Sequence, residues 1–191
     1  VQKFRSRVAR IFDVFVLTAM PIIVGAQLTS TELMELIAGD DFRASGPILT
    51  WLILALISVF MGTLYGHVIV AINKQRLMTL GYLTVAVIAV IGYFLYIPPY
   101  GMWGAVGVTL LSEALIALIT FFVVYKTSHA LPNLTVLFKA IVASAMMYLA
   151  LVKLDAPVLI DVLVGAVVYA SSLFALKAIT VKELRSLLPN R

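Results

Sequence analysis

The 191-residue sequence contains no cysteine and only two histidines. The lack of cysteine excludes disulfide bonds, thiolate metal ligands and cysteine nucleophiles. The two histidines are too few for a metal cluster, and neither has a second ligand at a suitable spacing. No nucleophile, base and acid occur together in a pattern that an enzyme would need. We therefore expect no metal site, no cofactor and no enzymatic activity.

Charged residues are also scarce, at 12% of the chain, whereas 63% of the residues are hydrophobic. Soluble domains average roughly 45–50% apolar and about 25% charged residues. The mean hydropathy of +1.10 indicates that lipid surrounds most of this chain. The net charge of +5 does not indicate nucleic-acid binding, because the basic residues lie between long apolar runs, as they do in membrane proteins.

A helix needs about 20 mostly apolar residues to cross a bilayer. Six segments meet this condition, and only short connections separate them. We therefore predict an all-α, polytopic membrane helix bundle that forms one unit over residues 1–191. The six predicted transmembrane helices are residues 12–28, 48–72, 77–97, 103–125, 136–152 and 158–178.

The first predicted span contains Pro21 and Gly25, so the helix is expected either to kink or to continue into the next segment. The longest connection, residues 29–46, begins with Thr29 and Glu32 at the spacing of a capping box. This pattern predicts a separate, short amphipathic helix that starts near Thr29 and lies in the membrane interface.

The distribution of lysine and arginine predicts the orientation of the chain. If the connections alternate between the two sides, one side has two basic residues, Arg43 and Lys153. The other side has twelve, and the positive-inside rule places it in the cytoplasm, with both ends of the chain in the cytoplasm and the bundle in the cell membrane. The twelve are Lys3, Arg5, Arg7, Arg10, Lys74, Arg76, Lys126, Lys139, Lys177, Lys182, Arg185 and Arg191.

Three sequence motifs follow one another at spacings that match the predicted helices. They are residues 39–45 (GDDFRAS), residues 71–76 (AINKQR) and residues 97–113 (IPPYGMWGAVGVTLLSE). The region that contains them resembles the polysaccharide flippases, a family of the superfamily that also includes multidrug and toxin extruders. Two departures from the family pattern are Val106-Gly107-Val108 in the third motif and Tyr93, where many members have asparagine.

The resemblance implies a two-lobe transporter that flips a lipid-linked oligosaccharide across the cytoplasmic membrane for polysaccharide biosynthesis. By that pattern the chain is a C-terminal portion: four helices of the second lobe, followed by an additional helix pair. An upstream lobe of the same protein would be missing from it. The expected partners are then membrane lipid, the lipid-linked oligosaccharide and that upstream lobe, and not nucleic acid. A drug or cation antiporter of the same superfamily and a non-transporting membrane scaffold subunit are the alternatives.

Glu113 lies near the middle of the fourth predicted span, where an ionised carboxylate facing lipid costs at least about 2.5 kcal/mol. At 100° per residue it shares about one third of the helix circumference with Thr109, Ser112, Ile116 and Thr120. Two interpretations stay open. The stripe lines a transport cavity in which Glu113 binds an ion or proton, or Glu113 is a structural acid that is protonated or hydrogen-bonded to a neighbouring helix.

Five further polar residues have two interpretations each. His67 is either a proton relay or a hydrogen-bonded packing residue. Lys74, Arg76, Lys126 and Lys139 either set the orientation of the chain or contact anionic lipid headgroups and the pyrophosphate of a lipid-linked sugar.

Overall fold

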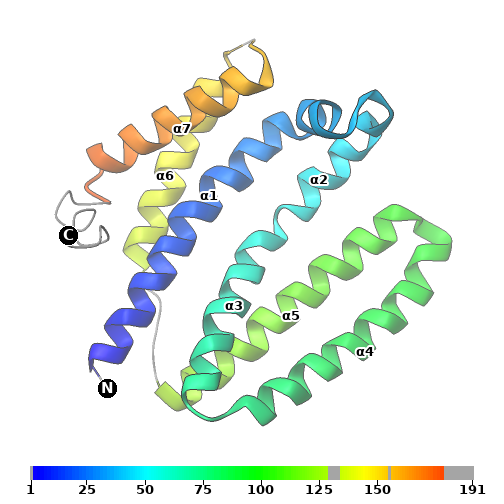
Figure 1. Cartoon of the computed structure of the whole chain (residues 1–191), viewed down its shortest axis with the longest axis vertical. Helices are drawn as coiled ribbons and strands as arrows, with labels where there is room; N and C mark the ends of the chain where they lie inside the picture. Colours follow the sequence, from blue (N-terminus) through cyan, green and yellow to red (C-terminus); the bar gives the residue numbers. More distant parts are fainter. Residues whose placement is uncertain (1, 129–133, 155, 179–191) are drawn as a thin grey trace.

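The structure is a computed structural model that describes residues 2–128, 134–154 and 156–178. In these residues all regular structure is helical (Figure 1). The elements are α1 (Gln2–Ala38), the 3₁₀ helix η1 (Asp40–Ser45), α2 (Gly46–Leu52), α3 (Ala55–Ala71), α4 (Gln75–Tyr100), α5 (Met102–Ser128), α6 (Leu134–Leu151) and α7 (Val158–Ala175).

Five of these helices, α1 and α4 to α7, are each long and apolar enough to cross a membrane. The segment Asp40–Leu52 and helix α3 are long and apolar enough only together, as a bent pair that is either a broken sixth span or a re-entrant loop. The predicted all-α membrane bundle is therefore confirmed, and the molecule is a multi-pass membrane protein. Four of the six predicted spans match single helices to within a few residues.

Helix α1 corrects the prediction for residues 29–38. It continues for 37 residues through Pro21 to Ala38, without the separate interfacial helix. Thr29 does not cap a helix start, because its hydroxyl donates a hydrogen bond to the Gly25 carbonyl one turn earlier (3.0 Å). At about 1.5 Å per residue α1 is roughly 55 Å long, which exceeds the hydrocarbon core of about 30 Å.

The second predicted span, residues 48–72, is not one straight helix. It is interrupted at Ile53 and Leu54, and the segment Asp40–Leu52 is inclined to α3 by 51°. Figure 1 shows the change of direction between α2 and α3. The apolar pattern of residues 48–61 does not indicate this break, because the stretch contains neither proline nor glycine.

Helices α4 and α5 form a long hairpin that packs against α3 (Figure 1). The turn depends on Gly101, whose φ of +56° is unfavourable for residues with a side chain. A Cβ atom on Gly104 would lie 2.1 Å from the Tyr96 carbonyl oxygen, so only glycine allows α5 to start this close to α4. Gly101 thus allows the tight turn, and Gly104 allows the close packing of the two helices.

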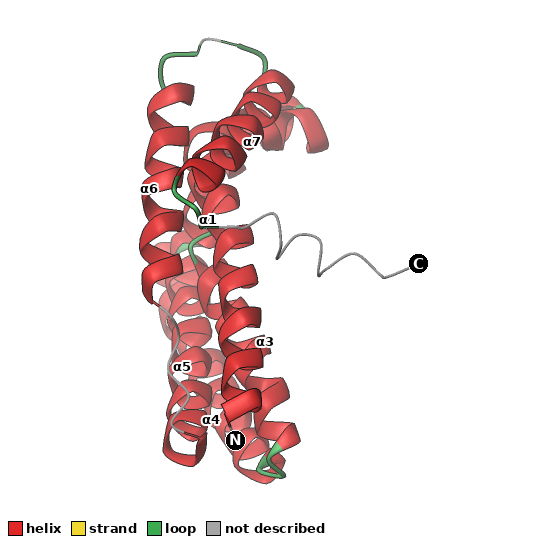
Figure 2. Cartoon of the chain, turned by 90° about the vertical axis from the view of Figure 1, so that its left-hand side faces the viewer, coloured by secondary structure: helices red, strands yellow, loops and turns green. Residues whose placement is uncertain are grey.

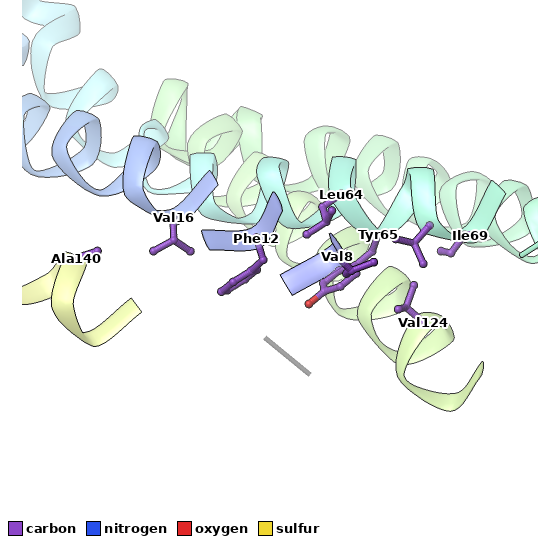
Figure 3. Packing of buried hydrophobic residues seen from close by; sticks show 9 residues of the cluster. Val8, Phe12, Val16, Leu64, Tyr65, Ile69, Val124 and Ala140 are labelled. Carbon is purple, nitrogen blue, oxygen red and sulfur yellow. The ribbon is translucent and has the colours of Figure 1, made fainter. Parts of the chain in front are cut away.

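Two apolar clusters hold the bundle together. The larger cluster joins α1, α3, α5 and α6, and Figure 3 shows side chains such as Phe12 of α1 and Tyr65 of α3 within it. The smaller cluster joins α6 and α7 through residues such as Met147 and Tyr169, with Leu17 of α1 packed against it. Figure 2 shows α1, α6 and α7 on one side of the molecule, where these three helices contact one another.

Basic residues occur at both ends of the bundle. Lys74 and Arg76 lie at the α3–α4 turn, at the same end as the start of α1 (Figure 1). Arg43 lies in η1 at the opposite end, where its guanidinium forms an ion pair with Glu35 (2.7 Å). That pair is solvent-exposed and adds little stability. Of the residues used to predict the orientation, Lys182, Arg185 and Arg191 lie outside the described residues.

Candidate functional site

Glu113 is partly buried on the side of α5 that faces α3 and α4. The residues one and two turns further along the same side, Ala117 and Thr120, are buried, and so is Val106 before it. No hydrogen bond or ion pair to the Glu113 carboxylate occurs in the described part of the chain. Tyr82 of α4 lies within electrostatic reach of it. The carboxylate is therefore inside a helix interface and has no cationic partner there.

The hydroxyl groups near Glu113 are satisfied mostly by their own helix. The Thr120 hydroxyl lies within hydrogen-bond distance of the Ile116 carbonyl (2.8 Å), and the Ser112 hydroxyl donates to the Thr109 carbonyl (2.9 Å). Such bonds remove the cost of a polar group in lipid without needing another helix. They leave these hydroxyls less available to a ligand.

Within the described part of the chain, a hydrogen bond between Tyr93 and Thr109 links the polar stripe of α5 to α4. The Thr109 hydroxyl donates its only proton to the Ala105 carbonyl (2.9 Å), so the Tyr93 hydroxyl is the donor in its contact with Thr109 (2.9 Å). Tyr93 therefore cross-links the two helices about one turn from Glu113. From the sequence, Tyr93 was noted only as a departure from a family pattern. Tyr82 was not identified as a neighbour of Glu113. The sequence around Tyr82 contains no pattern that would have identified it.

His67 lies on the exposed side of α3. Its Nδ1 is 2.7 Å from the Thr63 carbonyl oxygen, and a carbonyl only accepts, so Nδ1 bears a proton. In the described residues no hydrogen bond or ion pair connects His67 with Glu113, so the structure does not bring these two candidates into one site.

The four candidate basic residues differ in their surroundings. Lys74, Arg76 and Lys126 are exposed, and Lys126 lies in the last turn of α5, where a cation interacts favourably with the helix dipole. Lys139 is partly buried, and its ammonium group donates to the Lys177 carbonyl just after α7 (3.0 Å). Lys139 thus links the start of α6 to the end of α7, a structural role that the sequence did not indicate.

Glu113 lines neither of two cavities that the described helices form. The larger, about 200 Å³, is lined only by apolar residues of α1, α3 and α6, among them Phe15, Phe60 and Leu137. The smaller, about 10 Å³, lies between α3, α4 and α5 and includes Tyr82 and Thr120. Among the described residues no group of three or more His, Asp or Glu side chains could hold a metal ion.

The arrangement defines a class of protein: an all-α, multi-pass membrane protein in which the carboxylate of Glu113 lies partly buried on α5. The chain matches no protein-family model, no curated protein and no solved structure. The resemblance to polysaccharide flippases therefore rests on the three sequence motifs, and the activity that it implies is a proposal.

Proposed function

We propose that this chain is part of a secondary transporter that flips a lipid-linked oligosaccharide across the cell membrane, with Glu113 as an ion-coupling residue. The observation that supports it most is the Glu113 carboxylate, which lies in a membrane span without an ion pair or hydrogen bond among the described residues. Ionisable residues inside membrane spans are costly and occur mainly where function needs them. In a two-lobe transporter, such a residue would face the pathway between the lobes.

A second candidate function is a non-transporting scaffold subunit. It is favoured by the hydrogen bonds of Ser112 and Thr120 to their own helix and by the absence of Glu113 from the lining of either cavity. In a scaffold subunit, Glu113 would stay protonated and would have no contact with water. The two functions differ in whether the activity of the protein requires ionisation of Glu113.

Glu113→Gln tests the proposal in the protein that contains this chain. Glutamine has almost the shape of glutamic acid but does not ionise, so expression should stay close to wild type while transport falls at least tenfold. The assay is the restoration of surface polysaccharide in a strain that lacks its own flippase. Glu32→Gln, the same substitution at an exposed position of α1, is the matched control and should transport normally. Wild-type transport by Glu113→Gln would leave the scaffold as the better function.

The proposed orientation has both ends of the chain in the cytoplasm, and it can be tested separately. Because the chain has no cysteine, single cysteines can replace the exposed residues Phe42 and Lys74 at the two ends of the bundle. In intact cells a membrane-impermeant thiol reagent should label Phe42→Cys and not Lys74→Cys. The reverse labelling pattern would contradict the orientation.

A further inference from the structure

The interruption between α2 and α3 has no local cause in the sequence. Residues 48–61 contain neither proline nor glycine. Sharp bends in helices usually occur at these residues, at π-bulges, or where a side chain or water inserts into the backbone hydrogen bonds. Here a side chain inserts, and it comes from another helix.

The inserted group is the amide of Gln27 in α1. The Leu54 N–H donates to the Trp51 carbonyl (3.1 Å), three residues back, rather than to Thr50 as an α-helix requires. The Thr50 carbonyl therefore loses its backbone partner. The Gln27 side-chain N–H donates to it instead (3.0 Å). This matters because a carbonyl without a partner is costly in lipid.

The two helical pieces have different main neighbours: α2 packs mostly against α1 and α3 mostly against α5, although α2 also touches α5 and α3 also touches α1. Helix α2 lies on α1, where the Ser30 hydroxyl is hydrogen-bonded to the Thr50 hydroxyl and Gly46 lies directly against Thr31. Helix α3 is anchored by Tyr65 and Ile69 in the larger apolar cluster with α5. Contacts between α2 and α3 themselves are few. The break thus separates a segment that follows α1 from a helix that is fixed in the core.

The backbone at the break is close to that of a continuous helix. Ile53 has φ −63° and ψ −23°, and Leu54 has φ −63° and ψ −26°. An α-helix has φ near −63° and ψ near −42°. Small rotations would therefore bring the Leu54 N–H back to the Thr50 carbonyl, provided that Gln27 releases it.

We propose that residues 53 and 54 form a hinge and that Gln27 is its latch. In the bent state Gln27 donates to the Thr50 carbonyl and α2 is inclined with α1. In the straight state the Leu54 N–H takes that carbonyl, and α2 aligns with α3. The exchange leaves the carbonyl satisfied in both states, so the span can switch within the membrane. This inference concerns movement of the fold and does not depend on the proposed transport function.

The test measures a distance across the hinge in the whole chain, reconstituted in lipid nanodiscs. Spin labels are attached to cysteines that replace Phe42 of η1 and Met102 of α5, both exposed at the same end of the bundle. Pulsed electron paramagnetic resonance should give one main distance for the wild-type chain. Gln27→Leu removes the latch and should produce a second, straight-span distance that accounts for at least half of the molecules. An unchanged distance distribution in Gln27→Leu would overturn the proposal.

Two further variants separate the latch from a general loss of contacts or of folding. Ser30→Ala removes a hydrogen bond between the same helices but leaves the Thr50 carbonyl with Gln27, so it should keep the wild-type distance. Adding Leu54→Pro to Gln27→Leu should restore the wild-type distance, because proline has no N–H and its ring clashes with the Thr50 carbonyl in a straight helix. The φ of Leu54 already suits proline. A second distance in Ser30→Ala, or its persistence in the double variant, would also overturn the hinge.

Discussion

Helix α1 contains a proline and stays continuous, whereas the span of α2 and α3 has no proline at its break and is interrupted. The two places share one feature, which is a backbone carbonyl that has lost its usual donor. In α1 it belongs to Leu17, because Pro21 four residues later has no N–H. In α2 it belongs to Thr50, because the Leu54 N–H has another partner.

In both places a polar side chain from a neighbouring helix replaces the missing donor. The hydroxyl of the buried residue Tyr169 of α7 donates to the Leu17 carbonyl (2.9 Å), and the amide of the exposed residue Gln27 donates to the Thr50 carbonyl. The difference is what happens when the side chain is removed. At Thr50 a backbone N–H is available as a substitute, whereas at Leu17 proline excludes one. The first arrangement is exchangeable, and the second is permanent.

The largest effect is therefore expected for Tyr169→Phe. Phenylalanine keeps the packing of the ring but leaves the partly buried Leu17 carbonyl without its side-chain donor. The free energy of unfolding should fall by about 1–2 kcal/mol, which is at the upper end for hydrogen bonds in membranes. Reversible unfolding in mixed detergent and SDS micelles measures this loss. Tyr148→Phe in α6, an exposed tyrosine, is the matched control and should lose little.

Pro21→Ala tests whether proline causes the difference between the two sites, because it makes the Leu17 site resemble the Thr50 site. The new N–H of residue 21 can donate to Leu17, so the cost of Tyr169→Phe in this background should fall below about 0.5 kcal/mol. A double-mutant cycle over the two positions gives this coupling. Equal costs of Tyr169→Phe with and without Pro21 would show that the hydroxyl acts elsewhere.

The smallest effect on stability is expected for Gln27→Leu. Because the Leu54 N–H can take the released carbonyl, the free energy of unfolding should fall by no more than about 0.6 kcal/mol, the average for hydrogen bonds in membranes. The same unfolding experiment measures it. A loss as large as that of Tyr169→Phe would contradict the exchangeable character of the Thr50 site, whatever distance the labelled chain shows.

The helices themselves could be predicted from the sequence, because a bilayer requires long apolar runs and lysine or arginine ends them. Residues 77–97 and 103–125 were predicted as spans, and α4 and α5 extend only a few residues beyond these limits. Local sequence patterns gave a wrong prediction where a capping pattern occurs inside a sequence that continues as a helix. Thr29 and Glu32 have the spacing of a helix start, yet α1 continues through them.

The candidate site was predictable only in part. The period of the helix places Glu113, Thr109 and Thr120 on one side of α5, and that side does face other helices. Their partners could not be predicted, because Tyr82 and Tyr93 reach them from α4. Whether Glu113 ionises in a transport cycle stays a prediction for the Glu113→Gln experiment.

The sequence by itself determined that this protein is a multi-pass helical membrane protein, because 63% hydrophobic residues in long runs have no other suitable solvent. Only the tertiary structure decided where a span bends and where a proline is tolerated. Each depends on a carbonyl whose donor is distant in sequence, 23 residues from Thr50 and 152 residues from Leu17. In lipid no water can supply the missing hydrogen bond, so the packing of the helices determines both the position of the bend and the position at which proline is tolerated.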